Sequence, residues 1–153
     1  MPARRHCLAA GVASFAALAL APVAGRAEMA RFASVGGYAL GGHDAVAYVT
    51  RGVAAPGDAA FALQWKGAVW LFESAAAMEA FEMNPSAYAP QYGGYCAFGM
   101  SEGRAVPGDP RVFTVIDGRL YLGTDADALR RWSEDVAANA ARADRNWERM
   151  LEK

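Results

Sequence analysis

The chain has 153 residues, with 15 Lys and Arg against 16 Asp and Glu and a net charge of −1. This length fits one domain of ordinary size, and the charge lacks the basic excess that phosphate binding needs, so we expect no nucleic-acid partner. Cys7 and His6 lie in the first 27 residues, and the rest of the chain offers one cysteine, Cys96, and one histidine, His43. That part of the chain therefore cannot form an internal disulfide, a four-ligand Cys/His zinc site or a CxxC redox pair.

Residues 1–27 have the parts of a secretory signal. Arg4 and Arg5 precede a long uncharged run, and small residues then lead to a cleavage site before Glu28. We expect removal of this segment, a periplasmic or secreted protein, and no stable membrane anchor after cleavage. The arginine pair also resembles a twin-arginine signal, which exports folded proteins, and the sequence leaves both export routes open.

Residues 28–153 are predicted to form a single α+β domain: a small antiparallel sheet of two β-hairpins packed by helices, with a helical C-terminal segment. Lys66-Gly67 and Asp117-Gly118 are two-residue links suited to tight hairpin turns. Ser74 suits the N-cap of the helix that follows the first hairpin. The sequence shows no evident internal repeat. In chain order the predicted elements are a helical turn at 44–48, a hairpin at 61–65 and 68–72, a helix at 74–83, a hairpin at 111–116 and 119–122, and helices at 124–132 and 138–151.

Cys96 is the first candidate functional residue, as a nucleophile or as a soft metal ligand, because the thiolate form does both. Gly93-Gly94 before it suits a helix that begins near Cys96. The alternative is a small apolar residue buried in an aromatic core. Met100, four residues further on, would share a helix face with Cys96, and the two sulfurs could hold copper or another soft ion. Methionine is also a common core residue.

His43 is the remaining candidate for a general base or a metal ligand, in a glycine-rich segment beside Asp44. Nothing in the spacing connects it to Cys96, and a surface histidine or one bonded within its loop is the alternative. The candidate binding residues are those that precede Cys96, namely Tyr88, Tyr92, Gly93, Gly94 and Tyr95.

Several motifs together resemble the exported bacterial YHS-domain proteins. They are Gly42-His-Asp-Ala-Val-Ala-Tyr48, Trp65-Lys-Gly67, Ala89-Pro-Gln-Tyr-Gly-Gly-Tyr-Cys-Ala-Phe98 and Ala143-Asp-Arg-Asn-Trp147. The resemblance spans almost all of residues 28–153 and implies one YHS-like domain. Some members of that group carry selenocysteine at the position that matches Cys96, which implies a functional nucleophile or soft ligand there. The multi-cysteine metal site of other YHS domains has no counterpart, because Trp70-Leu-Phe-Glu-Ser-Ala stands at the matching place.

Three functions remain open at this point. The first is a periplasmic module that binds a soft metal, with copper foremost, or a small ligand through Cys96. The second is a thiol-redox enzyme with Cys96 as nucleophile, which needs an external thiol because residues 28–153 contain no second cysteine. The third is a structural or interaction domain in which Cys96 is buried. A binding module ranks ahead of an enzyme, and a monomer is the default expectation.

Overall fold

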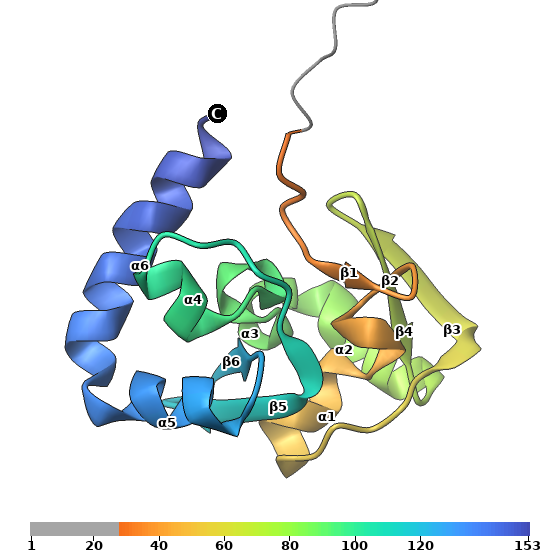
Figure 1. The fold of residues 1–153 in the computed structure, drawn as a ribbon. Helices are drawn as coiled ribbons and strands as arrows, with labels where there is room; N and C mark the ends of the chain where they lie inside the picture. Colours follow the sequence, from red (N-terminus) through yellow and green to blue (C-terminus); the bar gives the residue numbers. More distant parts are fainter. Residues whose placement is uncertain (1–27) are drawn as a thin grey trace, which may run out of the picture.

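The computed structural model describes residues 28–153, so the predicted signal segment lies outside the described residues. This part of the chain has an α+β fold with three separate two-stranded antiparallel sheets (Figure 1). The fold class and both predicted hairpins are confirmed, although each hairpin is a sheet of its own. Within residues 28–153 no helix is long and apolar enough to span a membrane. The elements are β1 (Ser34–Val35), β2 (Tyr38–Ala39), the 3-10 helix η1 (Leu40–Gly42), α1 (Ala45–Arg51), β3 (Asp58–Trp65), β4 (Ala68–Phe72), α2 (Ala75–Met83), α3 (Pro85–Tyr88), the 3-10 helix η2 (Gln91–Gly94), α4 (Ala97–Ser101), β5 (Asp109–Ile116), β6 (Arg119–Gly123), α5 (Ala126–Glu134) and α6 (Val136–Leu151).

Polar side chains begin the two helices that follow the hairpins. The Ser74 hydroxyl accepts a hydrogen bond from the Ala77 N–H at 3.2 Å, and the Asp125 carboxylate accepts one from the Ala128 N–H at 2.8 Å. Each bond satisfies an N–H group that the start of a helix leaves without a partner. Pro85 follows the end of α2 and is the first residue of α3, a position where its missing N–H costs nothing.

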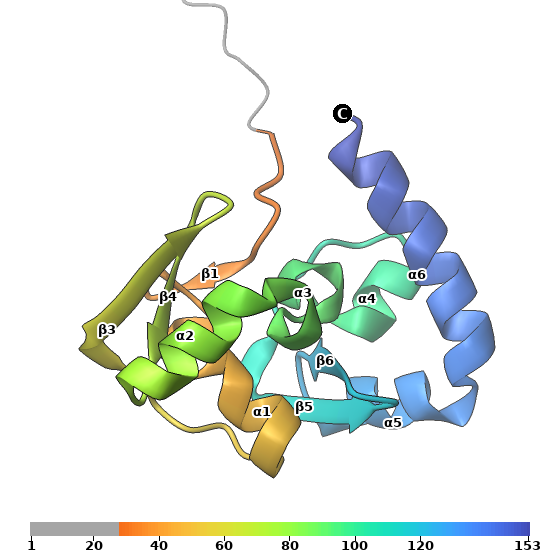
Figure 2. The same cartoon turned by 180° about the vertical axis from the view of Figure 1, so that it is seen from behind.

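The described chain contains two structurally equivalent halves, residues 40–85 and residues 92–136. In each half a 3-10 helix leads into a short α-helix, a bulged hairpin and a helix of nine residues (Figures 1 and 2). Leu40 and Tyr92, the equivalent residues of the two 3-10 segments, have left-handed φ values of 53° and 54°. The expectation of no internal repeat is therefore wrong.

Backbone hydrogen bonds recur between the two halves. Equivalent bonds run from Asp44 N–H to Ala55 C=O (2.8 Å) and from Cys96 N–H to Val106 C=O (2.7 Å), and from Gly57 N–H to Gly42 C=O (2.8 Å) and from Gly108 N–H to Gly94 C=O (3.0 Å). The two hairpins also change register at the same place, after Asp58 in one and after Asp109 in the other. Asp44 of the first half therefore corresponds to Cys96 of the second.

A Pro-Gly-Asp motif in each half carries the sequence signal of this repeat. Its glycine lies so close to the strand opposite that no side chain fits. A Cβ atom on Gly57 would lie 2.6 Å from the Leu71 backbone carbon, and one on Gly108 would lie 2.5 Å from the Leu122 Cβ. The motif is short and most other positions differ between the halves, which is why the repeat is hard to see in the sequence.

Two aromatic clusters form the core and occupy equivalent positions. Trp70 and Phe81 of the first half correspond to Tyr121 and Trp132 of the second, and all four side chains are buried. The ring centroids of Trp70 and Phe81 lie 4.9 Å apart, and those of Tyr121 and Trp132 lie 5.0 Å apart. Buried aromatic side chains supply much of the stabilisation of a small domain.

Helix α6 extends the second half, where the first half has only the short α3. It packs along α4 and α5 at the outer edge of the molecule (Figures 1 and 2). The Asn139 amide donates to the Arg131 and Trp132 carbonyls, both at 3.0 Å, and the Asn146 amide donates to the Met100 carbonyl at 2.8 Å. Helix α6 thereby fixes the two helices that surround Cys96.

Candidate functional site

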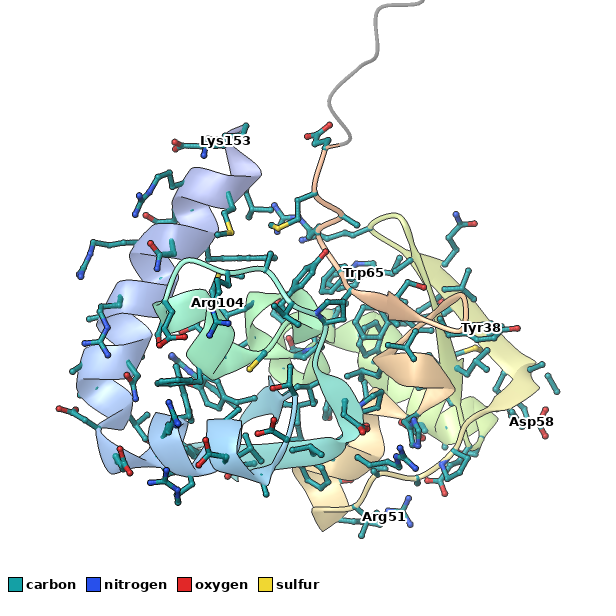
Figure 3. All side chains as sticks on the ribbon, viewed as in Figure 1. Tyr38, Arg51, Asp58, Trp65, Arg104 and Lys153 are labelled. Carbon is teal, nitrogen blue, oxygen red and sulfur yellow. The ribbon has the colours of Figure 1, made fainter. Side chains whose placement is uncertain are left out.

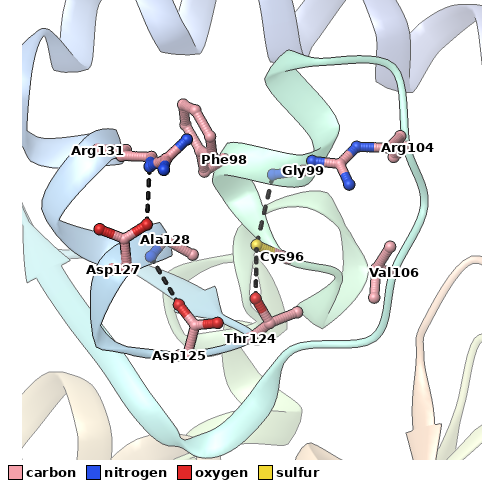
Figure 4. Close-up of a pocket in the computed structure, with 10 residues that line it drawn as sticks. All are labelled: Cys96, Phe98, Gly99, Arg104, Val106, Thr124, Asp125, Asp127, Ala128 and Arg131. Carbon is pink, nitrogen blue, oxygen red and sulfur yellow. Dashed lines mark hydrogen bonds and ion pairs between the residues drawn. The ribbon is translucent and has the colours of Figure 1, made fainter.

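Cys96 lies at the floor of a pocket of about 280 Å³ between α4, α5 and the loop from α4 to β5 (Figure 4). It is the N-cap of α4, and its sulfur accepts a hydrogen bond from the Gly99 N–H at 3.4 Å. The sulfur lies 3.9 Å from the Thr124 hydroxyl oxygen. Cys96 is only 2 % exposed, yet it forms part of the pocket wall. The residue is therefore buried and also faces a cavity, and its role as nucleophile or soft ligand stays a prediction.

Charged side chains surround the pocket above Cys96. The Arg131 Nε atom lies 2.8 Å from the Asp127 Oδ2 atom, and Arg104 pairs with Glu102. Hydrogen bonding to Arg130, together with the charge of Arg131, lowers the pKa of the Asp127 carboxyl below its usual value. The wall of the pocket therefore carries full charges of both signs at neutral pH.

The first half has an equivalent pocket, in which Asp44 stands where the second half has Cys96. Asp44 is 1 % exposed, and its carboxylate accepts hydrogen bonds from the Val46 N–H at 2.8 Å and the Glu73 N–H at 3.0 Å. Glu73 is the counterpart of Thr124. A buried carboxylate is stable only with such donors. The fold therefore holds an anion at this position in the first half.

The three candidate metal ligands are not brought together. Met100 is fully buried in the second aromatic cluster and does not line the pocket of Cys96. His43 lines a neighbouring pocket, which shares Thr124 with that of Cys96. The other side-chain donors near the sulfur include the oxygens of Thr124 and Asp125, which are hard ligands and a poor match for a soft ion. Among residues 28–153 no three His, Cys, Asp or Glu side chains are grouped as a metal site would need.

The tyrosines proposed as binding residues anchor the chain and do not line the pocket. The Tyr92 hydroxyl donates to the Asp144 carboxylate at 2.9 Å, and the Tyr95 hydroxyl donates to the Ala30 carbonyl at 2.9 Å. Burial and the bond to Asp144 raise the pKa of Tyr92 above its usual value. Tyr88 is half-buried and packs against the first aromatic cluster.

The two glycines before Cys96 turn the chain toward the start of α4. Gly93 and Gly94 have φ values of +61° and +82°, which favour glycine. A Cβ atom on Gly93 would lie 1.9 Å from the Arg31 carbonyl oxygen, so only glycine fits there. Both residues therefore position Cys96, and neither lines its pocket.

Arg104, Thr124 and Arg131 line the pocket, and sequence reasoning missed all three as site residues. They lie on a loop, at the end of a hairpin and on a helix, so no local motif connects them to Cys96. The repeated Pro-Gly-Asp motif could have aligned the two halves and paired Cys96 with Asp44 and Thr124 with Glu73, but only the structure places Thr124 beside Cys96.

No protein-family model, no curated protein and no solved structure matches the chain. The resemblance of its motifs to the exported YHS-domain proteins therefore stays a prediction. The site is therefore identified from the geometry around Cys96 and from the comparison between the two halves.

Proposed function

We propose that the protein is an exported thiol-redox protein in which Cys96 attacks a small oxidant. One observation carries this proposal: Cys96 stands at the floor of a pocket, in the position where the first half holds a buried carboxylate. N–H donors at such a position are favourable partners for a thiolate, which is the nucleophilic form of cysteine. Export is supported by the signal-like pattern of residues 1–27, which lie outside the described residues.

This proposal reverses the order of the first two functional hypotheses. Binding of copper would depend on a single soft donor, because neither Met100 nor His43 lines the pocket of Cys96. Attack on an oxidant needs only one sulfur and access to it. The pocket supplies that access for small molecules, although Cys96 itself is buried.

The proposed reaction oxidises Cys96 by two electrons and needs an external thiol to reverse it. The thiolate attacks one oxygen of a hydroperoxide, an S–O bond forms, the O–O bond breaks, and an alkoxide leaves and takes up a proton. An external thiol then attacks the sulfenic acid and releases water, which gives a mixed disulfide. A second external thiol attacks that disulfide, regenerates Cys96 and leaves as an oxidised disulfide.

The groups around the sulfur suit these reaction steps. The Gly99 N–H fixes the sulfur at the start of α4, with Sγ and N 3.4 Å apart. The Thr124 hydroxyl oxygen lies 3.9 Å from the sulfur, within reach of the two hydroperoxide oxygens, one that bonds to the sulfur and one that leaves when the O–O bond breaks. A hydrogen bond donated by Thr124 to that oxygen would stabilise the charge that develops on it.

Trapping of the sulfenic acid tests the proposal. The exported protein is treated with hydrogen peroxide in the presence of a 1,3-diketone, and the adduct is located by peptide mass spectrometry. We expect a diketone adduct on Cys96 in the folded protein, reversal by added thiol before trapping, and no adduct in Cys96→Ser. Thr124→Val should slow the oxidation, whereas Thr50→Val, an exposed threonine on α1, should not. Oxidation that begins only when the protein unfolds would overturn the proposal.

A further inference from the structure

We infer that the pocket above Cys96 selects an oxidant that carries a small negatively charged group, a carboxylate or a similar oxyanion, and that Arg104 and Arg131 bind this group. The inference depends on the proposed function for the reacting atom, the sulfur of Cys96, and adds the class of substrate. Its basis is the different placement of charged side chains in the two equivalent pockets.

The two carboxylates of the first pocket have no counterparts at the same positions of the second, where Asp125 and Asp127 stand instead in place of Ser74 and Ala76. Asp44 and Glu73 line the first pocket, and Glu73 is paired there with Arg51. Cys96 and Thr124 stand at the corresponding positions of the second pocket. A backbone N–H of the short helix therefore bonds to the side chain at the floor of each pocket, from Val46 in the first half and from Gly99 in the second. The second half has no carboxylate at the positions of Asp44 and Glu73.

Two guanidinium groups are added in the second pocket. Arg131 occupies the position of Ala80, and Arg104 occupies the position of Val53, whose backbone N–H makes the equivalent hydrogen bond. The two arginines reach the pocket from opposite sides of Cys96 (Figure 4). Arg51, the arginine of the first pocket, lies far from Arg104 in the molecule (Figure 3).

The acidic residues of the second pocket are already engaged. Asp125 caps α5, and Asp127 is bound by Arg130 and Arg131. The Asp127 carboxylate pairs with the Nε atom of Arg131. The guanidinium has further N–H donors, which can bind an oxyanion. The ion pair of Arg104 is exposed to solvent, with 63 % of the arginine side chain accessible, and exposed pairs are weak enough to exchange partners.

The size of the pocket limits the ligand. A volume of about 280 Å³ is below the range of sites for drug-sized ligands and suits a few heavy atoms beside the sulfur. A short organic acid with an electrophilic atom near one end fits both the size of the pocket and its two arginines. Its carboxylate would lie between the arginines while the electrophilic atom reaches the sulfur.

A matched pair of alkylating reagents measures this selection. Iodoacetate and iodoacetamide are similar in size and form the same S–C bond with loss of iodide, but only iodoacetate is negatively charged. We expect the ratio of the iodoacetate rate to the iodoacetamide rate at Cys96 to be about tenfold higher in the folded protein than in urea, since about 1.4 kcal/mol of attraction between partly exposed charges gives that factor. Added salt should lower the ratio.

Variants assign the effect to the two arginines. Arg104→Gln and Arg131→Gln should each lower the ratio about threefold, and the double variant should bring it to the value in urea. The control Arg51→Gln, in the first half, should leave the ratio unchanged. A wild-type ratio equal to that in urea, or a raised ratio that survives the double substitution, would overturn the inference.

The two proposals fail separately in this experiment. A folded protein that reacts with iodoacetamide but shows no preference for iodoacetate keeps the reactive thiol and loses the anion site. If neither reagent reacts before unfolding, the proposed function fails, and acetate binding to Cys96→Ser then decides the inference. In that variant acetate should shift the NMR signals of the Arg104 and Arg131 Nε–H groups, and no shift would refute an anion site.

Discussion

Replacement of Asp44 by alanine tests whether the fold holds an anion at the start of the short helix in the first half. Asp44 is 1 % exposed, and its carboxylate accepts hydrogen bonds from the Val46 N–H at 2.8 Å and the Glu73 N–H at 3.0 Å. A hydrogen bond to a charged group contributes about 1.5–3 kcal/mol. Asp44→Ala leaves both donors without this partner, so we expect a loss of about 3–5 kcal/mol in the free energy of unfolding.

Urea denaturation of the wild-type protein, Asp44→Ala and Asp44→Asn measures this loss. The asparagine variant keeps one neutral acceptor, so its loss should fall between those of wild type and Asp44→Ala. Ser74→Ala removes an exposed N-cap of the same half and should cost only about 1 kcal/mol. If Asp44→Ala costs no more than Ser74→Ala, the position is an ordinary cap, and the anion-site reasoning for its counterpart Cys96 is refuted.

Three further predictions concern the fold and the export of the chain. Gly108→Ala should destabilise the protein by about 2–4 kcal/mol in urea denaturation, because the new Cβ would lie 2.5 Å from the Leu122 Cβ; a change below 1 kcal/mol would show that the hairpin moves away easily. Burial raises the pKa of Tyr48 and Tyr92, so the folded state keeps protons that the unfolded state releases above about pH 10. The contribution of these two tyrosines to stability should therefore be constant below that pH and fall above it by about 1.4 kcal/mol per pH unit for each tyrosine, and equal stability at pH 9 and pH 11 would contradict this. Mass spectrometry of the exported protein should find Glu28 as its first residue, and a membrane-bound product that starts at Met1 would contradict cleavage.

Much of the fold was predictable because local chemistry determines it. The turns Lys66-Gly67 and Asp117-Gly118 set both hairpins, and Lys66 and Asp117 have left-handed φ values of 46° and 51°. Ser74 begins α2 as its hydroxyl chemistry suggests. The prediction that the two hairpins share one sheet was wrong. Their separation into two sheets follows from the packing of the two halves, which neither strand sequence determines.

The candidate site was predictable only at Cys96. A cysteine after two glycines gives a local signal, whereas Arg104, Thr124 and Arg131 reach the pocket through tertiary packing. Met100 has the right spacing to share a helix face with Cys96, but Cys96 caps the helix while Met100 lies inside it, and the methionine packs into the core. Spacing alone therefore suggested a pair of ligands that the fold does not present to one pocket.

The rate at which hydrogen peroxide oxidises Cys96 in the folded protein, compared with the rate in urea at the same pH, tests the central claim most directly. Hydrogen peroxide is small and uncharged, so the comparison does not depend on the anion site. The pocket and the donors around the sulfur should make the folded protein react faster than the unfolded chain. A slower reaction in the folded state, with Cys96 protected until the protein unfolds, would contradict the claim and favour a purely structural Cys96.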